Sequence, residues 1–421
     1  MGETMDRGEA KTGFEALNLP VWWTFGALAA GLVLGVLLGG TRLEAPLLDV
    51  TETVGSLWLR ALQMTIIPLV AALLVTGIAR MVETARAGAI ARRTLAFIFG
   101  ILALGTLLAA VAVPLLLEVF PIPAAAGQAL AADPGRAQTV PGMAEFVQSL
   151  VAPNLVSAAA ENAMLPLVLF FALFGVAVAR LPDGQRAQMT GFFTGLGNAM
   201  LTIIGWILWL APAGVFALAI GVAARAGTGA FLALGHYIFI VASLGFAVLV
   251  AAYPLAMLAG GKRPGDFARA VLPAQAVAIS TQSSLASLPA MLAACRQLGV
   301  RETSADFVLP LAVAIFRATS PAMNLAVAIY VAKLTGVPLT PAVIAAGAAV
   351  ALVTTIGSVS LPGTISFIAS VGPIALAMGV PIGPLALLVA VEMLPDIMRT
   401  VGNVTMDVAV TASVDQARSK D

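Results

Sequence analysis

Five polar side chains recur at helical spacing in the last apolar segment of the chain, residues 384–414. Successive members are four, three, four and four positions apart, so on a helix they share one face. They are Glu392, Asp396, Arg399, Asn403 and Asp407. Apart from these groups the segment is largely apolar and about long enough to span a bilayer. Charged groups at that depth usually face a protein interior or a water-filled cavity, so the stripe predicts a binding site inside a membrane protein.

The composition supports a membrane location. Of the 421 residues, 60% are hydrophobic and 10% are charged, whereas a soluble domain carries about a quarter charged residues. We therefore interpret the chain as a polytopic membrane protein rather than a soluble protein whose helix carries a fortuitous stripe. The net charge of +1 argues against nucleic acid as a partner. A single cysteine and a single histidine, Cys295 and His236, exclude a disulfide framework and a zinc cluster, and no cofactor is expected.

The first half reads as a series of apolar spans. Residues 1–19 carry mixed charges and are predicted to be a cytoplasmic lead-in. Spans are predicted at residues 21–40, 54–80, 94–117, 200–222 (kinked at Pro212) and 235–260, with a proline-broken assembly at 146–179. Lys and Arg cluster in short loops near residues 80–93, 180–186 and 262–263. By the positive-inside rule, these loops and both termini lie in the cytoplasm, and we expect a multi-pass protein of the bacterial inner membrane.

The second half carries apolar segments interrupted by polar, proline-containing tips. Residues 267–293 and 343–378 each place two half-length arms around such a tip, and residues 307–334 contain a break near Pro321. A tip facing lipid would leave backbone groups without hydrogen bonds, so both segments are predicted to be re-entrant hairpins buried in protein. The alternative is two ordinary kinked spans. Paired broken helices of this kind are typical of the substrate site of secondary transporters.

Together these features resemble the glutamate transporter homologues, the dicarboxylate/amino-acid:cation symporters, over essentially the whole chain. Three stretches carry the resemblance: a serine-rich first tip at residues 283–289, a second tip at Leu361-Pro362-Gly363, and the Asp-x-x-Arg-Thr-x-x-Asn-x-x-x-Asp pattern of residues 396–407. The resemblance implies an all-α fold with roughly eight transmembrane helices plus two re-entrant helical hairpins. It also implies a homotrimer embedded in lipid that works as an elevator. Residues 20–229 would be mostly scaffold, residues 230–414 together with 94–117 the moving transport part, and residues 415–421 a tail.

The resemblance also implies a substrate. The arginine that matches Arg399 takes a side-chain carboxylate in the family, and the aspartate that matches Asp396 takes the amino group. Thr400, Asn403 and Ser320 would complete the polar cradle, and the hairpin tips would add Ser284 and Gly363. This set fits L-aspartate or L-glutamate, since a guanidinium binds a carboxylate with two donors. The alternative is that Asp396 and Arg399 form an internal pair that stabilises the helix.

The predicted cation site departs from the family. Where the family carries Asn-Met-Asp-Gly-Thr, this chain has Phe316-Arg317-Ala318-Thr319-Ser320. A hard cation needs several oxygen ligands, and Phe316 and Ala318 supply none from their side chains. We hypothesise that Arg317 supplies a fixed positive charge there, with Asp407 as its first expected partner and Glu392 as its second. Ser358 in the second tip completes this expected cation region.

Transport would then be weakly coupled to sodium or independent of it, as exchange, facilitated diffusion or proton symport. If protons are used, Glu392 is the expected carrier, because burial favours a protonated carboxylate. Three alternatives stay open. Sodium could still bind with Asp407 as a ligand, the protein could be a conventional sodium- or proton-coupled dicarboxylate or amino-acid symporter, or it could act mainly as an anion channel or a sensor. No pattern of catalytic residues indicates an enzyme.

Overall fold

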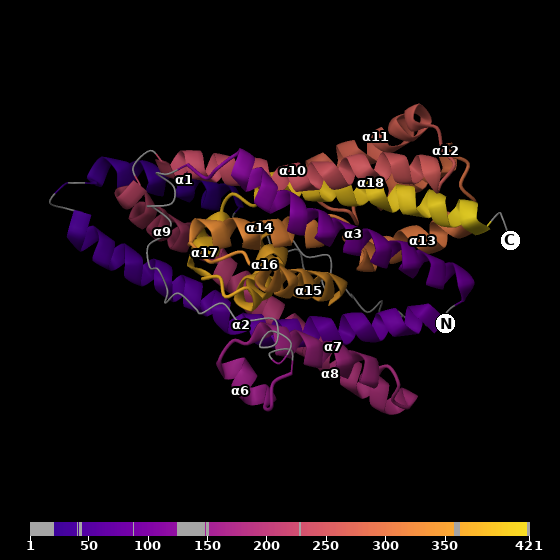
Figure 1. Cartoon of the computed structure of the whole chain (residues 1–421), viewed down its shortest axis with the longest axis horizontal. Coiled ribbons are helices and arrows are strands. Elements are labelled where there is room, and N and C mark those ends of the chain that lie inside the picture. Colours follow the sequence, from indigo (N-terminus) through magenta and orange to yellow (C-terminus); the bar gives the residue numbers. More distant parts are fainter. Residues whose placement is uncertain are drawn as a thin grey trace, which may run out of the picture.

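The computed structural model describes residues 21–39, 41, 44–86, 88–123, 148, 151–226, 229–357 and 363–418. Throughout these residues the regular structure is α-helical, and the helices form an elongated bundle (Figure 1). The all-α prediction is therefore confirmed for the described part of the chain. The predicted lead-in at residues 1–19 lies outside it.

The first half consists of helices grouped around one very long helix. These helices are α1 (Val21–Leu38), α2 (Glu44–Arg86), α3 (Ala89–Val119), α6 (Leu155–Ala160), α7 (Met164–Val178), α8 (Asp183–Trp209), α9 (Ala211–Ala226) and α10 (Gly229–Leu258). Helix α2 packs against α7, α8 and α9, and α1 lies along α9. Helices α3 and α10 pack instead against helices of the second half.

Two stretches of the first half differ from the prediction. The span expected at residues 200–222 is two helices, because α8 already begins at Asp183 and ends at Trp209, and α9 begins at Ala211. Pro212 explains the division, since its ring would clash with the carbonyl group four residues earlier if α8 continued. The assembly expected at 146–179 is broken into α6 and α7, but the break between them lies at residues 161–163, where Asn162 has a left-handed φ of 56°, and Pro166 lies within α7.

The second half contains both helical hairpins and the broken span. Its helices are α11 (Pro264–Thr281), α12 (Leu288–Gln297), α13 (Glu302–Ile315), α14 (Ser320–Leu334), α15 (Pro341–Gly357), α16 (Gly363–Ala377), α17 (Gly383–Leu388) and α18 (Met393–Arg418). Helices α11 and α12 pack together as the first hairpin, and α15 and α16 as the second. Residues 316–319 separate α13 from α14, as expected. The tip of the second hairpin, residues 358–362, lies outside the described residues.

The polar-striped helix was predicted to run through residues 384–414, and this prediction is wrong in one respect. The segment divides into α17 and α18 at residues 389–392, so Glu392 stands in a turn just before the helix. Pro395 favours a break at this point: it lacks an N–H to reach the Val391 carbonyl group, and it lies in the first turn of α18, where proline is best tolerated. Helix α18 then runs to Arg418 and packs against α10, α11, α13 and α3 (Figure 1).

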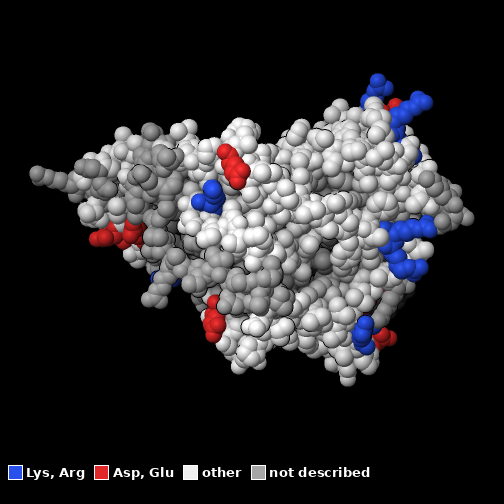
Figure 2. Space-filling view, viewed as in Figure 1, with Lys and Arg blue, Asp and Glu red and all other residues white. Residues whose placement is uncertain are grey.

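The surface fits a multi-pass membrane protein. Among the described residues, five helical stretches are long and apolar enough to cross a bilayer. They are Ala45–Ala85, Ala89–Val119, Asp183–Trp209, Phe231–Leu258 and Glu302–Leu334, the last of which joins the two halves of the broken span. Helix α18 is not among them. Most of the face in Figure 2 between the two ends of the molecule carries no charge, and Lys and Arg gather at the right-hand end.

The loops predicted to be cytoplasmic come together at one end of the molecule. Arg186 at the start of α8 pairs with Glu83 of α2 at 3.0 Å. Arg301 before α13 pairs with Asp415 of α18 at 2.7 Å, and Lys262 donates a hydrogen bond to the Leu298 carbonyl group at 2.8 Å. One set of contacts joins α2 to α8, and the other joins the start of α13 to the end of α18. Figure 1 shows both sets of helix ends at the same end of the bundle. That this end faces the cytoplasm remains a prediction.

Helix α1 lies against α9 at two glycines spaced four apart. A Cβ on Gly31 would lie 2.7 Å from the Phe216 carbonyl oxygen, and a Cβ on Gly35 would lie 2.6 Å from that of Ile220. Both distances are shorter than real Cβ contacts. Small residues with this spacing let two helix backbones approach closely in a membrane.

We expect Gly35→Leu to force α1 away from α9 and to destabilise the protein by about 1–3 kcal/mol, because the close backbone contact leaves no room for a side chain. The apparent melting temperature in detergent measures this effect. Gly26→Leu is the matched control, because a Cβ on Gly26 meets nothing within 4 Å. Equal losses for the two variants would contradict the close-packing role of Gly35.

Candidate functional site

Arg399 lies at the centre of a buried polar cluster. Its side chain is 5% exposed and has partners on three sides. One terminal nitrogen donates to Glu392 Oε1 at 2.6 Å, the other donates to Asn324 Oδ1 at 2.7 Å, and Nε lies 3.2 Å from Asp396 Oδ1. The guanidinium group is thus held by two carboxylates and an amide in a region with almost no access to water.

Both carboxylate oxygens of Glu392 accept hydrogen bonds. It is 1% exposed, and its second carboxylate oxygen accepts a hydrogen bond from the Tyr237 hydroxyl group of α10 at 3.1 Å. The turn at residues 389–392 brings Glu392 to Arg399, which lies seven residues later in the chain. Glu392 was the second expected partner of Arg317, and the structure pairs it with Arg399 instead.

Asp396 and Thr400 lie on α18 and make their hydrogen bonds and ion pairs within that helix. Asp396 is 5% exposed and forms the i,i+3 pair with Arg399 that the spacing allows. The internal-pair alternative is therefore seen in this conformation, with Glu392 added to it. The Thr400 hydroxyl donates to the Asp396 carbonyl oxygen, one helical turn earlier, at 2.9 Å.

Asn403 contacts the break in the other broken helix. Its side-chain oxygen accepts hydrogen bonds from the backbone N–H and the hydroxyl group of Thr319, both at 2.9 Å. Ser320 is the first residue of α14 and is 3% exposed. The expected cradle residues of α18 and the 316–319 break are therefore brought together.

Asp407 is fully buried, and neither of its carboxylate oxygens accepts a hydrogen bond from the described residues. Arg317, in the 316–319 break, attracts it electrostatically, and Arg317 attracts Asp396 in the same way. Asp407, the first expected partner of Arg317, therefore interacts with it electrostatically but accepts no hydrogen bond from it. The arrangement leaves a buried carboxylate that depends on a nearby positive charge.

The hairpin tips are less closely tied to the cluster. Ser284 lies half-buried in the turn at residues 282–287, and among the described residues no hydrogen bond joins it to the stripe. Gly363 begins α16 at the edge of the described range. Ser358 lies outside the described residues, so its expected role is not tested.

Three residues of the cluster were missed by the sequence reasoning: Tyr237, Asn324 and Thr319. Each comes from an element far from α18 in the chain, and Tyr237 and Asn324 are polar groups within largely apolar helices. A polar side chain in the middle of an apolar span was the available signal, because such groups usually have a partner. It indicates burial but does not identify the partner.

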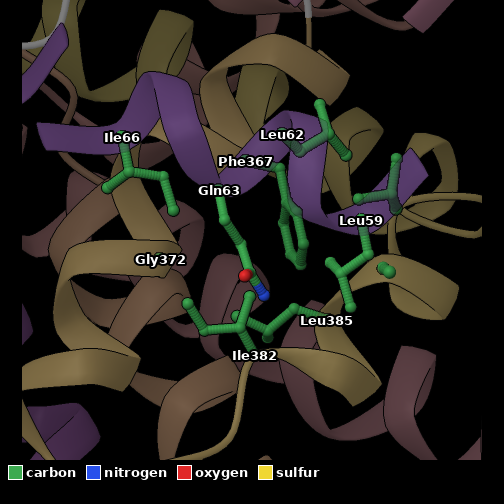
Figure 3. Close-up of a pocket in the computed structure, with 10 residues that line it drawn as sticks. Leu59, Leu62, Gln63, Ile66, Phe367, Gly372, Ile382 and Leu385 are labelled. Atoms are coloured by element: carbon green, nitrogen blue, oxygen red, sulfur yellow. The ribbon is translucent and has the colours of Figure 1, made fainter. Parts of the chain in front are cut away.

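A small cavity lies apart from the cluster, between α2 and the pair α16 and α17. Figure 3 shows its lining, which is apolar except for the amide of Gln63. None of the residues expected to bind substrate lines it. The polar chemistry of the described residues therefore lies on α18 and its neighbours rather than in this cavity.

We expect Arg399→Leu to destabilise the protein by about 3–5 kcal/mol, because it leaves the Glu392 and Asp396 carboxylates buried without a positive partner. Thermal unfolding in detergent measures this loss. Part of the stability should return as the pH is lowered, since protonated carboxylates no longer need the guanidinium group. Glu392→Gln, which keeps an acceptor for Arg399, should cost much less. A loss as large in Glu392→Gln as in Arg399→Leu would contradict this account.

Comparison with known proteins gives one consistent picture. The model of the sodium:dicarboxylate symporter family matches residues 21–417. The chain is 27% identical over 383 residues to the proton/sodium-glutamate symport protein of Bacillus subtilis (strain 168), covering 89% of this chain and 88% of that protein. It is 26% identical to the proton/glutamate-aspartate symporter of Escherichia coli (strain K12), covering 89% and 88% of the two chains.

A third relative is named for a different substrate. The C4-dicarboxylate transport protein of Anaeromyxobacter sp. (strain K) is 28% identical over 394 residues, which cover 88% of this chain and 86% of that protein. The residues matched by the family model, 21–417, include the polar cluster on α18. The chain belongs to the sodium:dicarboxylate symporter family, a family of transporters.

Proposed function

We propose that the protein is a secondary transporter for acidic amino acids, L-aspartate or L-glutamate, with sodium coupling that is weakened or lost. The observation that carries this proposal is the buried pair of Arg399 and Asp396 on one face of α18. A guanidinium group beside a carboxylate is complementary to a ligand that carries a carboxylate beside an ammonium group. Relatives named for glutamate and aspartate transport support this choice.

A dicarboxylate without an amino group is the second candidate. It is favoured by relatives named as C4-dicarboxylate transport proteins. Such a ligand would use Arg399 but would leave Asp396 opposite a carboxylate, which is unfavourable for two like charges. The presence of Asp396 therefore favours the amino acid.

The substrate carboxylate meets Glu392 at Arg399. In the structure Glu392, Asn324 and Asp396 take three of the five N–H donors of Arg399, and Glu392 makes the shortest of these contacts, at 2.6 Å. A substrate carboxylate can take the donor now given to Glu392 only if Glu392 loses its negative charge or moves away. Protonation of Glu392 removes the charge, while Tyr237 can still hold the carboxyl group in place. This competition makes Glu392 the proton carrier and couples substrate binding to proton uptake.

Arg317 provides the fixed charge of the site. It lies between the two halves of the broken span and attracts both Asp396 and Asp407. Asp407 has no hydrogen-bond donor among the described residues, so in its ionised form a nearby cation must offset its burial. A guanidinium group that already serves this purpose removes the need for sodium at that position.

The charges of the cluster agree with proton coupling. Glu392, Asp396 and Asp407 are negative when ionised, and Arg317 and Arg399 are positive. An amino-acid anion would add one negative charge to a site of low dielectric, which is costly. One proton carried with it leaves the total charge of the site unchanged between the empty and the loaded forms.

The further expectations follow from the same proposal. Residues 230–414 together with 94–117 would move as the transport part of an elevator against a scaffold formed mostly by residues 20–229. The packing of α3 and α10 against α14 and α18 supports grouping α3 with the second half. The protein would be a homotrimer in the bacterial inner membrane, with both termini in the cytoplasm.

Calorimetric binding of L-aspartate to the purified protein tests the proposal directly. We expect binding in sodium-free choline buffer, no change when sodium is added, and tighter binding at mildly acidic than at mildly alkaline pH. Binding that appears only with sodium would return the protein to the conventional sodium-coupled symporters. Absence of binding in both buffers would show that the substrate assigned to Arg399 and Asp396 is wrong.

Two variants separate the roles of the charged groups. Glu392→Gln should bind L-aspartate with an affinity that no longer depends on pH, because the competing charge is permanently removed. Arg317→Met should lose affinity in choline buffer and regain part of it when sodium is added, because the built-in positive charge is gone. Loss of affinity in Arg317→Met without any sodium response would count against the fixed-charge role.

Transport itself should be electroneutral. Uptake of labelled L-aspartate into proteoliposomes should respond to a pH gradient, and a potassium–valinomycin potential should change it little. Saturable counterflow in the same vesicles distinguishes a carrier from an anion channel or a sensor. A strong dependence on membrane potential would contradict the one-proton charge balance.

A further inference from the structure

Thr319 is the last residue before α14 and is completely buried. Its backbone N–H and its hydroxyl group both donate to Asn403 Oδ1 at 2.9 Å. The hydroxyl group has a second acceptor, the Arg399 carbonyl oxygen at 3.2 Å, and Asn403 Oδ1 is the nearer of the two acceptors for its single proton. One residue of the 316–319 break therefore contacts both ends of a helical turn of α18.

These contacts determine which way the Asn403 amide faces. A backbone N–H can only donate, so the atom of Asn403 that meets it must be the oxygen. The amide orientation is thus set by chemistry, although oxygen and nitrogen have similar shapes. With its oxygen occupied by two donors, Asn403 has only N–H donors left to offer to a ligand.

The packing around Thr319 prevents it from turning away. A Cβ on Gly402 would lie 2.6 Å from the Thr319 methyl carbon and 3.3 Å from the Gly245 carbonyl oxygen. The methyl group therefore fits only because residue 402, the neighbour of Asn403, is glycine. With its methyl group lodged there, the Thr319 hydroxyl is held toward Asn403.

We propose that Thr319 is a positioning residue that makes Asn403 a donor-only contact, so that the site favours a carboxylate over an amide at one end of the substrate. An amide that can rotate offers an oxygen to a ligand N–H as readily as an N–H to a ligand oxygen. An amide held by Thr319 cannot, and an uncharged amide on the ligand then gains less than a carboxylate. The inference rests on the proposed function, because it concerns the selectivity of the same site.

The test compares L-aspartate with its two monoamides, L-asparagine and L-isoasparagine, in competition with labelled L-aspartate. Thr319→Val keeps the shape and the backbone N–H donor but removes the hydroxyl donor, which is one of the two donors to Asn403 Oδ1, and Thr319→Ser keeps both donors. We expect Thr319→Val to reduce the discrimination against one of the two amides by about threefold to tenfold. Thr319→Ser should retain the discrimination. An unchanged preference in Thr319→Val, or an equal loss of affinity for all three ligands, would overturn the positioning role.

A second measurement does not require substrate. Thr319→Val should lower the apparent melting temperature of the otherwise unchanged protein more than that of Asn403→Ala, in which only the Arg399 carbonyl oxygen is left as an acceptor for the hydroxyl group. Thr319→Ser should shift both backgrounds equally, because it alters only packing. Equal shifts for Thr319→Val in both backgrounds would show that the hydroxyl group does not act through Asn403. If the unchanged protein binds none of the three ligands, the proposed substrate fails, and this cycle still decides whether Thr319 holds Asn403.

Discussion

The buried guanidinium group of Arg399 is the constraint on which the rest of the structure depends. A positive charge with 5% exposure is tolerated only when acceptors surround it. Those acceptors come from α14, from α18 itself and from the turn before α18, and Tyr237 of α10 supports one of them. Satisfying this single group therefore ties three separate elements of the bundle together. The apolar packing supplies most of the contact between these helices, and the cluster around Arg399 adds directional hydrogen bonds between them.

Interrupted helices make this arrangement possible. In a continuous helix every backbone group is used internally, and side chains point outward from a cylinder. At residues 316–319 and 389–392 the chain leaves that geometry. The first break turns the backbone N–H of Thr319 toward Asn403, and the second brings the Glu392 carboxylate to Arg399. Both breaks stand beside α18, so backbone and side-chain groups meet there that a straight helix would keep apart.

Much of this could be predicted from the sequence, because it depends on local patterns. The i,i+3 spacing of Asp396 and Arg399 allowed their ion pair to be considered. The polar, proline-containing tips predicted the two helical hairpins. Pro395 could have indicated the break before α18. The continuous apolar sequence around it favoured a single helix instead. The partners of Arg399 and Glu392 could not be predicted in this way. Asn324 is 75 positions from Arg399, and Tyr237 is 155 from Glu392. Such contacts depend on how α10 and α14 pack against α18, which no local pattern describes.

The polarity of α18 has a consequence for how the protein is made. Helix α18 is not among the helices that are apolar enough to cross a bilayer on their own, and a helix with several charged groups partitions poorly from the insertion machinery into lipid. The helices that pack against it, α3, α10, α11, α12 and α13, all precede it in the chain, as does α14, whose Asn324 accepts a hydrogen bond from Arg399. A chain is synthesised from its amino terminus, so these helices are already in the membrane when α18 emerges. Its insertion can then be completed by assembly with them rather than by its own hydrophobicity.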